Sequence, residues 1–365
     1  MPRFRPEIEA LTPYEVGRPI ADVARELGLD PSTIVRLTAN ESPDGPFPGV
    51  GDAVADVMGG SNRYPDPDVW ELGHALSAYL GVDRSNLLFG AGSVALLADI
   101  ALALGGPGTK AIYAWPSFFM YRFVTTWAMG SASEVPLNEA FELDLSAMRD
   151  AVDDSTRVVY VCNPNNPTGT IRSSDDIERF IRSVPPEVLV VVDEAYHDFV
   201  TDDDYRTAIP LALELDNVVV LRTFSKVYAL AAHRIGYAVG HVETLSEIRK
   251  AQAPLTINQA AQAAALASLG QPEELRRRVE ANAAARHHLL GVMAERGLDY
   301  ADSQTNFVFF KTPGGDSKAT SDEFTKRGVI IRPMSGGWMR VTVGAPVENE
   351  RFVGVLDEVL DTVSE

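Results

Sequence analysis

The sequence predicts an α/β protein in which a doubly wound, mostly parallel sheet is joined to a smaller α+β domain. Three continuous apolar runs, at residues 158–161, 188–192 and 218–221, indicate parallel strands, because strands buried on both faces lack the polar alternation of half-exposed ones. Helical spacing at Ser174–Ser183 separates the first two runs, as in a βαβ unit. At roughly 150 residues per domain, the 365 residues indicate two domains.

Residues 1–36 are expected to form an extended N-terminal arm that belongs with the small domain. Turn residues dominate this arm, and Ile20–Leu27 has helical spacing before Asp30 and Pro31 end that piece. The larger domain is expected over residues 37–257. In its first half we expect a helix at 72–80, a strand at 86–89, a buried helix at 94–104, a strand at 111–114 and a helix at 122–129.

The pattern changes at residue 258, and the small α+β domain is expected over 258–365. Two Ala- and Arg-rich helical stretches, Gln259–Leu269 and 273–295, come first. Residues 314–318 are expected to be a mobile loop. The expected strands of this domain are 306–310, 329–331 and 339–343.

Composition and charge exclude several classes of function. The net charge of −19 disfavours a nucleic-acid partner, because such a surface repels phosphates. The single cysteine, Cys162, excludes an internal disulfide framework, and no Cys/His cluster has zinc spacing, so we expect no metal. The first seven residues lack the apolar core of a secretory signal, and the apolar stretch at 94–104 is too short to span a bilayer. We therefore expect a cytoplasmic protein with no membrane partner.

The glycine-rich turn at residues 90–95 has the form of the G-x-G-x-x-A dinucleotide fingerprint. A nicotinamide enzyme would need a carboxylate near the end of the next strand to bind the ribose, and that strand ends with Trp115 and Pro116. A nicotinamide cofactor is therefore disfavoured. Two interpretations remain: backbone N–H groups at a helix N-terminus that face a phosphate, or a strand-to-helix turn without a ligand.

Two further segments follow buried strands. Asp193 comes directly after the run at 188–192, at the sheet edge where open α/β folds bind ligands. An ionised Asp there needs donors or a cation, such as a protonated pyridine nitrogen, unless it only caps the next helix. The loop at 163–169 either presents pre-aimed side-chain amides or is a simple Asn/Pro turn.

Lys226 follows a third buried strand, in the segment Thr223-Phe-Ser225-Lys226. A lysine at a strand's carboxyl end, among hydroxyls, is placed for Schiff-base chemistry. Arg234 lies eight residues further on and could complete a phosphate site with the two hydroxyls. Taken alone, the segment is also compatible with a solvated lysine at a strand end.

Together, four strand ends supply a phosphate-type turn, an Asn loop, an acid and a lysine to the same edge of one sheet, which no purely structural explanation predicts. On these residues the chain resembles the fold-type I pyridoxal-phosphate aminotransferases, and among them the histidinol-phosphate aminotransferases. The resemblance covers nearly the whole chain. Its marks are LTPY at 11–14, TANESP at 38–43, RYPDP at 63–67, NPNNPTG at 163–169, DEAY at 193–196, TFSK at 223–226, RIGY at 234–237 and MRVTVG at 339–344.

The resemblance implies roles for individual residues. The catalytic residues would be Lys226, which forms an aldimine with the cofactor, Asp193 at the ring nitrogen, and Tyr196. The pyridoxal phosphate would also contact Phe118, Asn166, Gly92, Ser93, Val94, Thr223, Ser225, Arg234 and, from the second subunit of a homodimer, Tyr64. The substrate would contact Tyr14, Asn40, Tyr64, Arg332 and Arg340.

The resemblance also implies ping-pong transamination. The freed amine of Lys226 would move a proton between the substrate carbon and the cofactor, and 2-oxoglutarate would accept the amino group. The expected amino donor is histidinol phosphate, of histidine biosynthesis. Tyr14 and the pair Arg332 and Arg340 support this expectation, because together they could hold a substrate phosphate.

Other functions stay open at this point. After Gly92-Ser93, Val94-Ala95 stands where many histidinol-phosphate enzymes carry an acidic or amide pair. Ser93-Val94, with the apolar Phe118 and Phe119, resembles instead the aromatic amino acid (phenylalanine) aminotransferases of the actinobacterial type. An amino-acid phosphate decarboxylase is a third possibility, because related folds perform that chemistry. A non-catalytic regulatory module is disfavoured, because the N-terminal arm is too short and too acidic to bind DNA.

Overall fold

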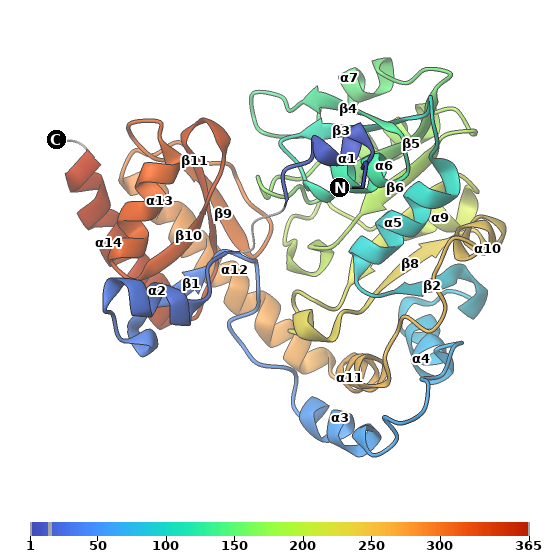
Figure 1. Ribbon diagram of the computed structural model, residues 1–365, viewed down its shortest axis with the longest axis horizontal. Helices are drawn as coiled ribbons and strands as arrows, with labels where there is room; N and C mark the ends of the chain where they lie inside the picture. Colours follow the sequence, from blue (N-terminus) through green and yellow to red (C-terminus); the bar gives the residue numbers. More distant parts are fainter. Residues whose placement is uncertain (1, 14–16, 364–365) are drawn as a thin grey trace.

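The computed structural model describes residues 2–13 and 17–363, and within them two sheets form separate layers (Figure 1). In this part of the chain the larger sheet has seven strands in the order β2-β8-β7-β6-β5-β3-β4. The pairings from β7 through β6, β5 and β3 to β4 are parallel, whereas β8 is antiparallel to both β2 and β7. The predicted mostly parallel sheet is therefore confirmed. Its strands are β2 Leu87–Gly90, β3 Lys110–Trp115, β4 Ser131–Pro136, β5 Thr156–Cys162, β6 Leu189–Asp193, β7 Val218–Thr223 and β8 Gly236–Gly240.

Both faces of the large sheet are buried under helices, which explains the continuous apolar runs. In β6, Val190 and Val192 belong to one hydrophobic cluster, while Leu189 and Val191 belong to the cluster on the opposite face. The first cluster includes residues of α4 Trp70–Leu80, α7 Leu145–Asp150, α8 Ser174–Ser183, α9 Ile209–Glu214 and α11 Gln259–Leu269. The second includes residues of α5 Ser93–Leu104, α6 Met120–Trp127 and α10 Val242–Arg249.

The smaller sheet has the order β1-β10-β11-β9 and its own core. Strand β1 comes from the N-terminal arm and pairs in parallel with β10, whereas the other two pairings are antiparallel. The register of β10 and β11 places Arg332 directly opposite Arg340. The elements of this layer are β1 Val35–Leu37, β9 Phe307–Lys311, β10 Val329–Pro333, β11 Trp338–Thr342, α2 Ile20–Leu27, α12 Pro272–Glu295, α13 Ser317–Lys326 and α14 Pro346–Val363.

The N-terminal arm joins the two layers. Its first helix, α1 Pro6–Glu9, lies beside α6 on the large sheet, whereas α2 and β1 lie on the small one (Figure 1). The guanidinium of Arg5 donates to the backbone carbonyl of Trp127 at the end of α6 (3.2 Å). The arm therefore passes between the layers, and Thr12 and Pro13 in this passage line the main cavity.

Some expectations about local structure were wrong. Residues 317 and 318, expected in a mobile loop, begin α13, because the Asp316 carboxylate accepts from the backbone N–H groups of Lys318 and Ala319 and caps this helix. Helix α6 starts two residues before the expected position. None of the helices in the described ranges is long and apolar enough to cross a membrane.

Candidate active site

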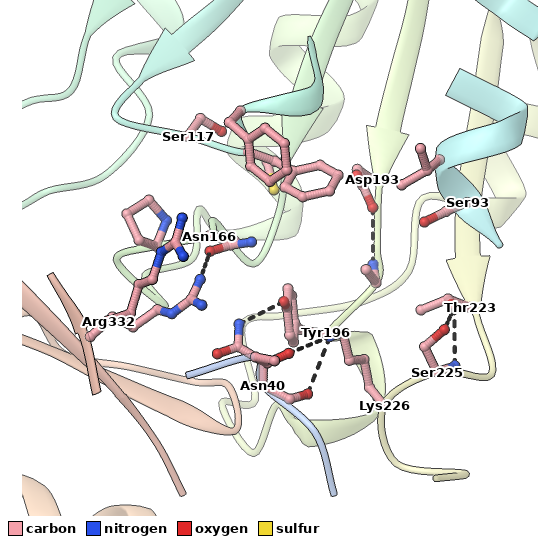
Figure 2. A pocket seen from close by; sticks show the side chains of 18 of the residues that line it. Asn40, Ser93, Ser117, Asn166, Asp193, Tyr196, Thr223, Ser225, Lys226 and Arg332 are labelled. Carbon is pink, nitrogen blue, oxygen red and sulfur yellow. Dashed lines mark hydrogen bonds between the residues drawn. The ribbon is translucent and has the colours of Figure 1, made fainter. Parts of the chain in front are cut away.

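A cavity of about 690 Å³ lies at the carboxyl ends of β2, β5, β6 and β7, where the small sheet and the N-terminal arm close over it (Figure 2). Most of the residues predicted from the sequence line it. They are Asn40, Ser93, Val94, Phe118, Asn166, Asp193, Tyr196, Thr223, Ser225, Lys226, Arg234, Arg332 and Arg340. The exceptions are Gly92, which adjoins the cavity at the start of α5, and Tyr64, whose 84% exposed side chain lies between α3 (Val50–Met58) and α4. Tyr14 lies outside the described residues.

Asp193 ends β6 and is 2% exposed. The hydroxyl of Tyr121 donates to its Oδ2 (2.9 Å), and the backbone N–H of Ala195 donates to its Oδ1 (3.2 Å). Burial raises the pKa of Asp193 to about 6, although both donors and the more distant Lys226 favour the charged form. A further cation at the carboxylate would stabilise its ionised state.

Lys226 lies across the cavity from Asp193 (Figure 2). Its Nζ donates to the backbone carbonyls of Ala39 (3.3 Å) and Asn40 (3.2 Å) and lies 5.5 Å from the centre of the Tyr196 ring. Burial and, after it, the charge of Arg340 lower the pKa of Lys226 to about 8. The neutral amine, which is the nucleophilic and basic form, is therefore accessible near neutral pH.

A third group of donors gathers where α5, β7 and β8 meet. Ser225 accepts from the Thr223 hydroxyl (2.9 Å) and from the Arg234 guanidinium (3.5 Å). The backbone approaches closely here, since a Cβ on Gly92 would lie 2.4 Å from an Arg234 nitrogen and one on Gly236 would lie 2.7 Å from the Ser93 backbone N. Hydroxyls, a guanidinium and the N-terminus of a 12-residue helix form a suitable site for a phosphate dianion.

The small sheet completes the cavity through β11. Arg340 donates to the Asn166 Oδ1 (2.6 Å) of the Asn loop, and Thr342 on the same strand accepts from the backbone N–H of Asn40 (3.0 Å). The Asn40 side chain in turn donates to the Tyr196 hydroxyl (2.8 Å). These bonds connect both sheets and the arm at one place, so the geometry of the site depends on how the two layers meet.

Sequence reasoning missed several lining residues. Phe119, named above in support of an aromatic donor, forms an aromatic wall with Trp115 and Phe123, which were not assigned to the site. Met334, also missed, adds an apolar side chain from the small sheet's side. Phe119 and Phe123 contact one another edge to face (5.7 Å between ring centres), one helical turn apart. This i, i+4 spacing in the sequence could have predicted that Phe123 lies beside Phe119. Tyr121, the donor to Asp193, was also missed.

Comparisons with known proteins agree with this geometry. The family model "Aminotransferase class I and II" matches residues 32–356. The aromatic amino acid aminotransferase of Streptomyces avermitilis is 39% identical over 356 residues (98% of this chain and 97% of the relative). The histidinol-phosphate aminotransferase 1 of Thiobacillus denitrificans is 39% identical over 359 residues (97% and 93%). The crystal structure of histidinol-phosphate aminotransferase from Sinorhizobium meliloti in complex with pyridoxal-5′-phosphate has a TM-score of 0.89 at 27% identity, covering 99% of this chain and 98% of that one.

Replacing Gly236 with alanine should destabilise the corner between β8 and α5. The added Cβ would lie 2.7 Å from the Ser93 backbone N and 2.8 Å from the Arg222 carbonyl oxygen, and backbone atoms cannot rotate away. We expect Gly236→Ala to lower the free energy of unfolding by about 1–3 kcal/mol, as for overpacked cores, measured by denaturant unfolding. The control is Gly354→Ala in α14, where a Cβ meets open space and helix propensity favours alanine. Equal stability of the Gly236 variant and the unaltered protein would contradict the close approach.

Proposed function

Because this chain belongs to the class I and II aminotransferases, a family of pyridoxal-phosphate enzymes, we propose that it transfers the amino group of histidinol phosphate to 2-oxoglutarate. The observation that supports this donor best is the cross-strand pair Arg332 and Arg340, both of which line the cavity. Two guanidinium groups match the double negative charge of a phosphate monoester, whereas a single carboxylate needs one.

Three features of the cavity fit pyridoxal phosphate. Asp193 is a buried acid whose described donors are neutral, and a protonated ring nitrogen would supply the missing cation. The corner of Ser93, Ser225 and Arg234 offers phosphate donors around glycines that leave no room for a Cβ. Lys226, an amine with a lowered pKa, lines the same cavity as both groups.

When bound, pyridoxal phosphate supplies an aldehyde that takes up the substrate nitrogen and a ring that withdraws electrons from the substrate carbon. In our proposal, Lys226 Nζ would accept the proton from that carbon and deliver it to the former aldehyde carbon of the cofactor, as a general base and acid whose pKa is near the working pH. The carbonyls of Ala39 and Asn40 hold this amine in place. Ionised Asp193 would pair with the ring nitrogen and so maintain the electron-withdrawing state of the ring.

The remaining residues bind and orient. Asn166 and Tyr196 would donate to the phenolic oxygen of the cofactor, and Asn40 holds the Tyr196 hydroxyl in position. Phe118 would cover one face of the ring. Arg340, which contacts Asn166 in this structure, would bind the anionic end of the substrate.

A second donor class is supported by the aromatic wall. Trp115, Phe119 and Phe123 suit a flat ring, and Val94 adds a further apolar side chain to the cavity. A phenyl group buried against such a surface has no polar atom that would lose a hydrogen bond, whereas the nitrogens of an imidazole would need polar partners. An aromatic amino acid aminotransferase is therefore the alternative function.

We also propose a homodimer with shared active sites. Tyr64 belongs to the motif that resembles a cofactor-binding segment, yet it is 84% exposed and is not among the residues that line the cavity of its own chain. An exposed aromatic side chain of this kind supports a site that is completed by a second copy.

Removal of Lys226 should abolish covalent attachment of the cofactor. Borohydride reduction of the holoprotein, followed by peptide mass spectrometry, should place the cofactor mass on Lys226, because a reduced Schiff base is stable. The variant Lys226→Ala should carry no label and should not turn over. The control Lys250→Ala removes an exposed lysine at the end of α10 and should be labelled like the unaltered protein. A label elsewhere, or turnover without Lys226, would contradict the assignment.

The donor can be identified by single-turnover absorbance. Histidinol phosphate should convert the cofactor faster than phenylalanine does, because two arginines can neutralise its phosphate. The variant Arg332→Gln should slow conversion by histidinol phosphate roughly ten- to a hundredfold, because it removes a charge-assisted hydrogen bond to the phosphate. Conversion by phenylalanine should be slowed less. Faster conversion by phenylalanine would instead support the aromatic amino acid as donor, whereas no conversion by either would contradict both.

A further inference from the structure

Tyr121 is a fully buried tyrosine behind the cavity, and none of the motifs in the sequence includes it. It lies on α6, and its hydroxyl donates to Asp193 Oδ2 over 2.9 Å. Burial raises the pKa of Tyr121 well above its ordinary value, so the hydroxyl stays protonated and remains a donor. Tyr121 is not among the residues that line the cavity, so its hydroxyl reaches the carboxylate from within the protein.

Packing fixes the position of this hydroxyl. The Tyr121 ring stacks on Tyr160 with 4.7 Å between ring centres and an angle of 7°, and it meets Phe118 edge to face at 5.7 Å and 88°. A third contact, to Tyr113, has ring centres 5.6 Å apart. The ring cannot move without displacing Phe118, whose side chain lines the cavity.

Other ionisable groups near Asp193 do not replace this donor. Burial raises the pKa of the Cys162 thiol to about 12, so it stays protonated, and its Sγ donates to the backbone carbonyl of Pro164 (3.5 Å). Glu194, which disfavours ionisation of its neighbour, is held by Arg222 (2.8 Å). Burial also keeps the Tyr196 hydroxyl protonated, but this hydroxyl accepts from Asn40. Lys226 is bonded to backbone carbonyls across the cavity.

We propose that Tyr121 is a positioning residue that acts on the bound cofactor through Asp193: it keeps this carboxylate ionised and aimed into the cavity, and it fixes Phe118 in the same unit. The inference rests on the proposed pairing of Asp193 with the ring nitrogen. A buried carboxylate that loses one of two donors is more easily protonated, and a protonated acid cannot pair with a pyridinium.

The test compares two buried tyrosines that stack on each other. Tyr121→Phe removes the hydroxyl that contacts Asp193 and keeps the ring. Tyr160→Phe is the matched control, because the Tyr160 hydroxyl has no hydrogen-bond partner among the described residues, and the nearby Thr125 hydroxyl donates to the Tyr121 carbonyl (2.7 Å). We expect Tyr121→Phe to weaken pyridoxal phosphate binding to the apoprotein about ten- to a hundredfold, and the control to leave it unchanged.

The pH dependence of the affinity for pyridoxal phosphate shows whether Tyr121 positions Asp193 or only packs against its neighbours. Affinity should fall as the pH falls through the pKa of Asp193, because protonation removes the charge. Without the Tyr121 hydroxyl, the Asp193 pKa is higher, so the fall should move to higher pH by about one unit. A tyrosine that only packs would change affinity at every pH and would not move this midpoint. An unmoved midpoint, or equal behaviour of the two tyrosine variants, would overturn the inference.

A double-mutant cycle with Asp193→Asn tests separately the role of Asp193 at the ring nitrogen and the role of Tyr121 in positioning Asp193. If Tyr121 acts through the carboxylate, Tyr121→Phe should add little in the Asp193→Asn background. Normal cofactor affinity of Asp193→Asn would overturn the role of Asp193 and this inference with it, whereas weak binding there with an undiminished Tyr121 effect would overturn this inference alone. Should Tyr121→Phe unfold by itself, recovery of its thermal stability in the Asp193→Asn background would support the coupling, and unfolding in both backgrounds would overturn it.

Discussion

The carboxylate of Asp193 is buried at the end of β6, and a charge held away from water destabilises a fold unless donors or a cation compensate it. Two donors among the described residues do so, one from α6 and one from the backbone after β6. The neighbouring acid, Glu194, points elsewhere and is satisfied by Arg222, by the Thr207 hydroxyl and by the Ala208 backbone. Two consecutive acids therefore have opposite functions: Glu194 fixes the turn after β6, and Asp193 faces the cavity.

Much of the large sheet was predictable, because strands buried on both faces leave continuous apolar runs such as those in β5, β6 and β7. Strands β4 and β8 were not predicted. β4 is an edge strand, with the partly exposed sequence SASEVP, and β8 (GYAVG) begins and ends with glycine, which is rare in strands. For both, the pairing with a neighbouring strand decides the conformation, and a local pattern does not record that pairing.

The candidate site divides in the same way. Lys226, Asp193 and Asn166 were predicted because each follows a buried parallel strand, and all such strands end at one edge of the sheet. Tyr121 and Thr342 were missed, since their contacts join segments 72 and 302 residues apart, and a tyrosine in an amphipathic helix or a threonine in a strand has no unusual local signal. The chemistry of the site was thus visible in the sequence, whereas the groups that orient it required the fold.

The register of β10 and β11 has a consequence for how this enzyme could change its donor during evolution. Arg332 and Arg340 face each other across an antiparallel pair joined by a short turn. Side chains alternate between the faces of a strand, so inserting or deleting one residue in the turn would break the match between them and send one guanidinium toward the hydrophobic core. Substitution of individual side chains on the two strands could therefore change the donor. A change in the length of their connection would instead disrupt the pairing of the two arginines.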